Sequence, residues 1–274
     1  MRLAILLAVA SSGIGGLCAQ DAREIVRRSV ELDQVNWLRM KDYTWIARET
    51  ERSLDSAGRV KSEKTEAWET VILYGEPHRR MLERDGKPLS PADKQKEQEK
   101  FDKAVAKLEH ETPAQKERRV AEYEKQREKD REFLREVPEL YDFRLEGDGK
   151  IGGYDVWVIS ATPRPGYQPT HRDAKPLQKI RAKLWIDKRE YQWARLEAET
   201  TATISFGLFI VRLEPGAKLV FEQARVNDEV WLPKREFVSG TGRLGLVKKL
   251  SGEDEVTWNN YRKFQVDSKV IATE

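Results

Sequence analysis

The sequence predicts an α+β fold: a curved antiparallel β-sheet with one N-terminal helix and a charged helical insert. From Arg181 to Val266 the chain reads as apolar or alternating segments separated by turn residues, the pattern of an antiparallel meander. Residues 21–40 place apolar side chains at helical spacing, and residues 91–136 are densely charged. A meander of about seven strands curls readily into a barrel or half-barrel.

The first nineteen residues have the features of a secretory signal peptide. Arg2 supplies a positive charge before a short apolar run, and Ala19 is a small residue suited to signal peptidase cleavage. We therefore expect a periplasmic or secreted protein cleaved after Ala19. The alternative is a lipoprotein anchored through Cys18, although Leu17 is not the small residue that usually precedes such a cysteine. No later apolar run approaches 18 residues, so we expect no transmembrane segment in the mature chain.

Composition narrows the classes of function. Cys18 is the only cysteine, so a chain cleaved after Ala19 has no disulfide and no thiolate chemistry. The 50 basic and 47 acidic residues nearly balance, and no basic cluster is interleaved with aromatic residues. Nucleic acid is therefore not an expected partner.

The N-terminal part of the mature chain is predicted as a helix followed by three strands. Ala22, Ile25, Val26 and Val30 fall at helical spacing, and Asp21 is the expected N-cap. The strands alternate in part and are separated by glycine-containing turns. They are expected over residues 43–52, 60–74 and 78–84.

The insert over residues 91–136 is predicted to form two helices. Ser90-Pro91 and Thr112-Pro113 are cap-and-proline starts. Of these 46 residues 26 are charged, 13 of each sign, so a solvated hairpin projecting from the body is expected. A lid or docking arm over a cleft is the alternative. A coiled coil is not expected, because no heptad pattern is sustained.

The rest of the chain is predicted to be mostly strands. Turns are expected at Gly147-Asp148-Gly149, Gly152-Gly153 and Ser239-Gly240, a proline-rich loop over residues 163–175 and a helical turn over residues 176–180. The expected strands are residues 143–146, 156–159, 181–186, 191–201, 208–213, 218–227, 229–239, 242–250 and 255–266.

Several stretches resemble the bacterial outer-membrane lipoprotein-sorting proteins. They are Arg84 to Leu89 with an Asp-Gly-Lys turn, Tyr154 to Pro163 as a strand running into proline, and Lys183 to Asp187 with Trp-Ile-Asp. The resemblance implies an open half-barrel closed on its concave side by helices. We accordingly expect residues 20–274 to be a single carrier-like domain, with an insert at 91–136 longer than the helices of the small carriers.

No catalytic, metal or cofactor site is predicted. His78, His110 and His171 are isolated, and neither a zinc-protease motif nor a serine nucleophile elbow occurs. Gly147, Gly149 and Gly152 match the spacing of a dinucleotide fingerprint, but no helix is expected behind them. A pair of carboxylates for glycoside chemistry stays open, because 47 acidic residues make such pairs uninformative.

A concave binding surface is the feature that the predicted fold offers. If apolar side chains line it, it can hold an acyl chain or an apolar peptide. The candidate lining residues are Trp45, Trp68, Leu73, Trp157, Ile159, Leu184, Ile186, Trp193, Leu208, Ile210, Phe221 and Trp231. The alternative for each is a place in a dry core. Trp185 and Ile186 cannot both line the surface, because neighbouring residues of a strand face opposite sides.

These observations favour a non-enzymatic protein that binds or carries a hydrophobic ligand, such as a lipid or a lipoprotein acyl chain, without a cofactor. An envelope sensor or scaffold that binds another protein is the alternative, and an unrecognised hydrolase is a third hypothesis. The loop over residues 163–175 carries Arg164, His171, Arg172 and Lys175. It could hold an anionic head group, but a solvated loop is the main expectation.

Overall fold

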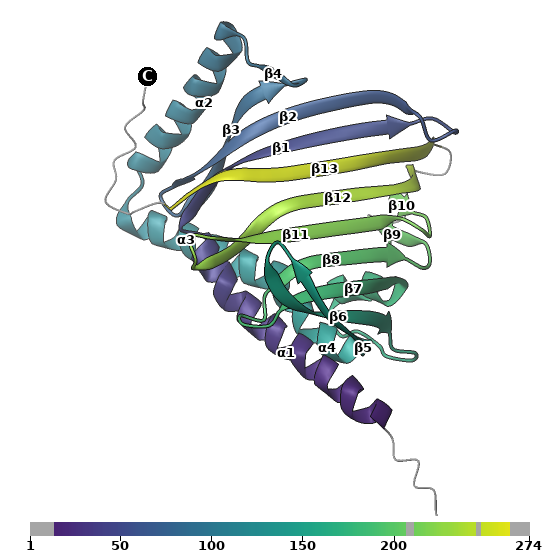
Figure 1. Cartoon of the computed structure of the whole chain (residues 1–274). Helices are drawn as coiled ribbons and strands as arrows, with labels where there is room; N and C mark the ends of the chain where they lie inside the picture. The colour runs from purple at the N-terminus through teal and green to yellow at the C-terminus, as the bar shows by residue number, and fades with distance from the viewer. Residues whose placement is uncertain (1–13, 207–210, 245–247, 264–274) are drawn as a thin grey trace, which may run out of the picture.

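A single long antiparallel sheet dominates the structure, with helices packed against it (Figure 1). The computed structural model describes residues 14–206, 211–244 and 248–263. In these residues the strands are β1 (Tyr43–Leu54), β2 (Val60–Leu73), β3 (Glu76–Arg84), β4 (Lys87–Pro88), β5 (Tyr141–Ile151), β6 (Tyr154–Pro163), β7 (Ile180–Asp187), β8 (Trp193–Thr200), β9 (Ile204–Phe206), β10 (Val211–Leu213), β11 (Lys218–Val226), β12 (Val230–Leu244) and β13 (Lys248–Lys263).

The sheet is curved and open, which confirms the predicted half-barrel. Its strand order is β4-β3-β2-β1-β13-β12-β11-β8-β7-β6-β5, and the short pair β9 and β10 joins β12. The first strand, β1, pairs with the last, β13, from Tyr43 opposite Lys263 to Ser53 opposite Gly252. This pairing joins the N-terminal strands to the meander that ends the described chain.

The described helices are α1 (Ile14–Met40), α2 (Pro91–Glu109), α3 (Pro113–Arg131) and α4 (Val137–Leu140), with the 3₁₀ helices η1 (Glu132–Glu136) and η2 (Arg172–Lys179). Both predicted starts of the insert are present. The Ser90 side chain accepts a hydrogen bond from the Asp93 amide, and Thr112 forms a capping box with Gln115. In the part of the chain that the structure describes, no helix has the length and apolar character to cross a membrane.

The N-cap prediction at Asp21 is wrong, because α1 begins at Ile14 and continues through Asp21. The expected cleavage site after Ala19 thus lies within this helix. The rest of the expected signal peptide, residues 1–13, lies outside the described residues.

Two predicted turns are parts of continuous strands. Gly147 to Gly149 belongs to β5, where the pairing register shifts between Leu145 and Gly147, so this glycine accommodates a bulge. Ser239-Gly240 lies inside β12. A Cβ at Gly240 would lie 2.6 Å from the Ala217 Cβ, so glycine there permits a close approach of neighbouring chain and not a turn.

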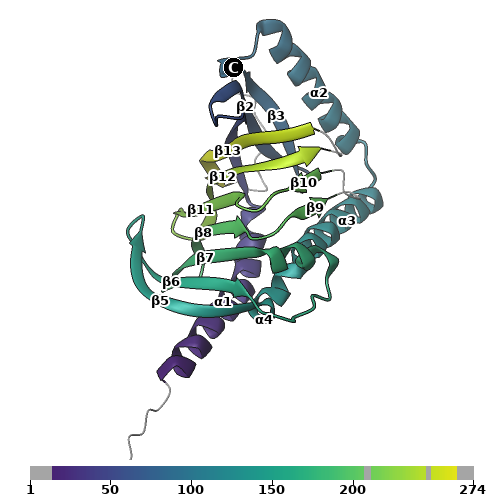
Figure 2. The same cartoon turned by 90° about the vertical axis from the view of Figure 1, so that its right-hand side faces the viewer.

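We call the face of the sheet against which α1 packs the inner face. Ala22, Val26 and Val30 of α1 belong to the same buried cluster as Ile159 of β6 and Leu184 of β7. The insert ends on the same side, because Phe133 and Leu134 of η1 pack against this cluster. Figure 2 shows α1 and α3 converging beside the strands. The insert therefore projects only in part, since its C-terminal end joins the core.

Candidate functional site

Two rows of side chains on the inner face change from apolar to acidic across the sheet, whereas the next row on β13, β1 and β2, formed by Trp258, Ala47 and Trp68, stays apolar. Paired residues of antiparallel strands share a face, so the strand registers define rows of neighbouring side chains. One such row runs from β5 to β2 through Leu145, Ile159, Leu184, Leu196, Phe221, Glu236, Val256, Glu49 and Glu66. The first five of these side chains are apolar, and three of the remaining four are acidic.

The adjacent row on the inner face changes in the same way. It runs through Phe143, Ala161, Ala182, Ala198, Leu219, Val238, Asp254, Glu51 and Lys64. Here the apolar side chains continue to β12, and charge begins at Asp254 of β13. The change in chemistry therefore falls at β12 in the first row and between β12 and β13 in the second.

A cavity of about 270 Å³ lies on the apolar side of this boundary. It is enclosed by α1, the end of the insert and the strands β8, β11 and β12. Most of its wall is apolar or aromatic. The lining residues are Asp33, Asn36, Trp37, Met40, Asp130, Arg131, Phe133, Leu134, Trp193, Phe221, Gln223, Trp231 and Pro233.

Two sets of contacts hold the helical wall of the cavity in place. Asn36 of α1 donates to the Trp231 carbonyl and accepts from the Trp231 amide, each at 2.7 Å. Arg131 at the end of α3 forms an ion pair with Asp33, and its guanidinium lies 4.4 Å from the centre of the Trp37 ring. Arg127 lies over the same ring at 4.6 Å. These contacts fix α1 to β12 and α3 to α1.

Three lining residues carry a buried polar atom without a hydrogen-bond partner. They are Arg131 Nε, Trp193 Nε1 and Gln223 Oε1. A buried polar group left unpaired costs about 1–3 kcal/mol. The wall of the cavity therefore contains hydrogen-bonding capacity that the protein itself does not use.

The carboxyl groups beyond the cavity are half-buried. Burial raises the pKa of Glu236, and the charge of Asp254 raises it further. Burial and the charge of Glu51 likewise raise the pKa of Asp254. For Glu49 burial and Asp254 act in the same direction, partly opposed by Arg79. Among the described residues, Glu49, Glu236 and Asp254 form no ion pair, so this part of the inner face carries uncompensated negative charge.

The twelve predicted lining residues fall into separate groups. Trp193 and Phe221 line the cavity, and Trp231 borders it while its indole packs against Tyr154 in another cluster. Ile159, Leu184 and Ile186 are buried in the core beneath α1, and Trp157 packs against that core. Trp185 contacts the other cluster, with Val156, Ala194 and Trp231, as expected for a strand neighbour of Ile186 that faces the opposite side.

Of the remaining predicted residues, Trp45, Trp68 and Leu73 are not part of the cavity wall. Trp45 of β1 contacts Tyr261 at 6.3 Å between ring centroids, and Trp68 of β2 lies under Arg79 at 5.1 Å. Leu73 is buried at the end of β2. Leu208 and Ile210 lie outside the described residues.

Sequence reasoning missed the helical wall of the cavity. Asp33, Asn36, Trp37 and Met40 stand at positions i, i+3, i+4 and i+7 of one helix, the spacing of a single face. Phe133-Leu134 interrupts the charged insert, which was a signal that this end is buried. Their approach to β11 and β12 is a long-range contact that this spacing does not reveal.

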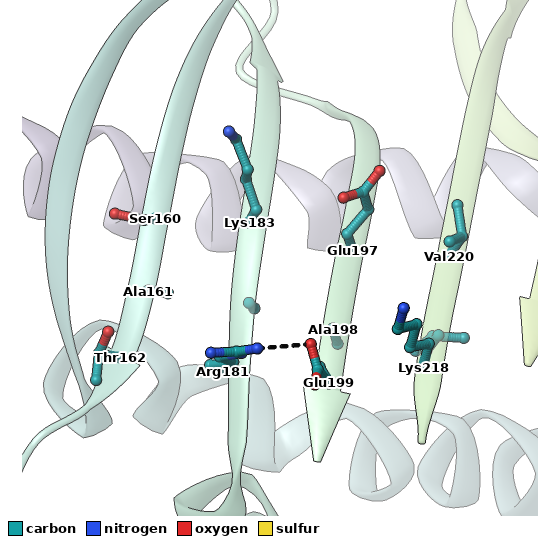
Figure 3. A pocket seen from close by; sticks show the side chains of 12 residues that line it. Ser160, Ala161, Thr162, Arg181, Lys183, Glu197, Ala198, Glu199, Lys218 and Val220 are labelled. Atoms are coloured by element: carbon teal, nitrogen blue, oxygen red, sulfur yellow. Dashed lines mark hydrogen bonds and ion pairs between the residues drawn. The ribbon is translucent and has the colours of Figure 1, made fainter. Parts of the chain in front are cut away.

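A shallow depression of about 320 Å³ lies on the outer face of β6, β7, β8 and β11 (Figure 3). Arg181 Nη2 and Glu199 Oε2 are 2.8 Å apart there. Lys183, Glu197 and Lys218 are its other charged side chains, so the charges nearly balance. Opposite charges on an exposed sheet face are an ordinary arrangement of cross-strand neighbours.

The loop over residues 163–175 is tied to the body by its own contacts. Glu136 of η1 accepts hydrogen bonds from the amides of Thr170 and His171 at 3.0 and 2.6 Å. Arg164 Nε lies 3.2 Å from Asp142 Oδ1. Arg164 and His171, two of the side chains expected to meet an anionic head group, thus already lie beside carboxylates. Within the described residues no three His, Cys, Asp or Glu side chains are grouped to hold a metal ion.

No protein-family model and no curated protein matches the chain. Solved structures that are similar include a putative outer membrane lipoprotein-sorting protein domain from Vibrio parahaemolyticus, with 14% identity, a TM-score of 0.38 and coverage of 89% of this chain and 95% of that one. A DUF1329 family protein from Desulfovibrio piger has 12% identity, a TM-score of 0.34 and coverage of 92% and 95%. A LolA superfamily protein from Nitrosomonas europaea has 10% identity, a TM-score of 0.29 and coverage of 92% and 97%.

Proposed function

We propose that this protein is exported and binds a small hydrophobic or amphipathic ligand, such as a lipid or an acyl chain, in the cavity beneath α1 and α3. It acts as a carrier and not as an enzyme. The cavity supports the proposal, because apolar and aromatic side chains supply most of its wall and a few polar groups converge on it, the usual composition of a ligand site. Its volume of about 270 Å³ is enough for roughly nine non-hydrogen atoms at ~30 Å³ each.

The first test is native mass spectrometry of the chain purified from its own cell envelope. A lipid or acyl species that remains in the native spectrum and is lost on denaturation supports the proposal. Acyl mass that survives denaturation indicates lipidation at Cys18 instead. A ligand-free chain that also fails to take up fatty acids, alcohols or amines in solution would overturn the proposal.

A matched pair of variants places the ligand. Gln223→Trp adds an indole to the cavity wall, whereas Val220→Trp adds it to the depression on the outer face of the same strand. We expect Gln223→Trp to lose the bound species and Val220→Trp to keep it, with both variants folded by circular dichroism. If both variants retained the bound species, the cavity would be excluded as the ligand site.

A further inference from the structure

The cavity lies where the apolar and acidic parts of the inner face meet. Phe221 lines the cavity on β11, and its cross-strand partner on β12 is Glu236. Paired side chains of this kind lie about 5 Å apart at Cβ. A ligand that fills the cavity and extends along the sheet therefore passes directly from aromatic wall to carboxylate.

The charged side chains that line the cavity also carry a net negative charge. Asp33, Asp130 and Arg131 are its charged lining residues, and Arg131 is already paired with Asp33. An anionic ligand would have to compete with Asp33 for this guanidinium. A cationic ligand meets no such competition.

Two of the unpaired buried polar atoms are acceptors, whereas Arg131 Nε and Trp193 Nε1 in the cavity wall are donors. Gln223 Oε1 in the cavity wall and Asp254 Oδ1 on β13 are both buried without a partner. Each can accept a hydrogen bond that an ammonium donates. Trp193 and Phe221 add aromatic faces, which attract cations.

Resting on the proposed function, we infer that the ligand is a cationic amphiphile: its alkyl portion fills the cavity, and its ammonium group lies toward Glu236 and Asp254. The half-buried carboxyls, including the unpaired Asp254 Oδ1, gain a partner in this arrangement. The raised pKa values of Glu236 and Asp254 are consistent with a place for positive charge that the chain does not fill. A fatty acid of the same length would bring a second negative charge to the same place.

The experiment compares n-decylammonium, n-decanol and n-decanoate by isothermal titration calorimetry on the delipidated full chain at pH 7 and low salt. We expect decylammonium to bind at least tenfold more tightly than decanoate, with decanol between them. Added salt should weaken the binding of decylammonium and leave that of decanol unchanged. Equal or tighter binding of decanoate would overturn this inference alone, whereas absence of binding by all three would overturn the proposed function as well.

Charge-neutral variants locate the ammonium. Glu236→Gln and Asp254→Asn should each reduce the preference for decylammonium over decanoate by threefold or more, with little change for decanol. Glu197→Gln removes a carboxylate from the outer face and should change none of the three affinities. A preference that survives the double variant Glu236→Gln, Asp254→Asn would show that these carboxyls are not the partners of the ammonium.

Discussion

Two rows of the inner face are apolar beneath α1 and mostly acidic on β12, β13, β1 and β2, although both parts belong to one sheet with one strand geometry. Under α1 the side chains Ile159, Leu184 and Ile186 are almost fully buried, and they exclude water with the help of the helix. On the other side Glu49, Glu236 and Asp254 keep partial contact with solvent. What covers a sheet face thus decides its chemistry, and the boundary between the two parts is where an amphiphile fits.

We expect the largest difference in the free energy of unfolding when apolar side chains from the two parts of one row are each truncated to alanine. Leu184→Ala in the apolar part should lower the free energy of unfolding by about 2–5 kcal/mol, because a fully packed site leaves a cavity. Val256→Ala in the acidic part should cost about 1 kcal/mol, because its surroundings are less buried. Urea unfolding measures both. Equal losses would mean that the two parts are packed alike.

In the part of the structure covered by helices, the carboxyl of Glu136 contributes to stability in a way that depends on pH. Burial alone would raise the pKa of this carboxyl, but hydrogen bonds from Thr170 and His171 outweigh it and lower that pKa. A lowered folded-state pKa stabilises the fold above the unfolded value, and that stabilisation is lost as pH falls through the folded value. Glu136→Gln should therefore cost about 1–3 kcal/mol at pH 7, and the loss should shrink under acid in urea titrations at several pH values. A loss independent of pH would contradict this account.

Gly240 tests the continuity of β12. Gly240→Ala places a Cβ against Ala217 and should destabilise the chain by about 1–3 kcal/mol. Ser239→Ala in the same strand is the matched control and should stay within about 0.5 kcal/mol. If both variants unfold at the same temperature as the parent, the close approach at Gly240 is absent.

The smallest expected change in the free energy of unfolding is a stabilisation, in contrast to the losses expected for the other variants. Burial and Asp254 raise the folded-state pKa of Glu236, so this carboxyl favours the folded state below its unfolded pKa, and the contribution is lost as pH rises through the folded value. Glu236→Gln should thus stabilise the ligand-free chain at pH 7, by on the order of 0.5 kcal/mol. The gain should vanish near pH 4 in thermal scans. A destabilised variant at pH 7 would show that Glu236 already has a partner.

Local patterns predicted much of the fold. The two caps of the insert, the apolar strand over residues 156–159 and the turn at Gly152-Gly153 are present where they were expected. Two turns were predicted wrongly because glycine residues have other roles at those positions. Gly147 marks a bulge and Gly240 a close contact, yet in the sequence both resemble the glycines of turns.

The candidate site was predicted only in part. Trp193 and Phe221 were found because strand residues of this kind face a concave surface, whereas the Trp231 indole packs against Tyr154 in another cluster. Trp37, Arg131 and Phe133 were not, because nothing near them in sequence indicates that they approach β11 and β12. The acidic rows of the inner face also escaped notice, since Glu49 of β1 is distant in sequence from Glu236 and Asp254 of β12 and β13.

The sequence by itself determined the helices, most of the strands and the α+β class, because helical and strand periodicity and capping are local properties of the chain. The tertiary structure alone decided that β1 pairs with β13 and that α1 covers only part of the inner face. It also decided that a cavity remains between α1, α3 and β11. These features depend on contacts between residues that are distant in sequence, where register and helix docking are set by packing of the whole chain and not by any one segment.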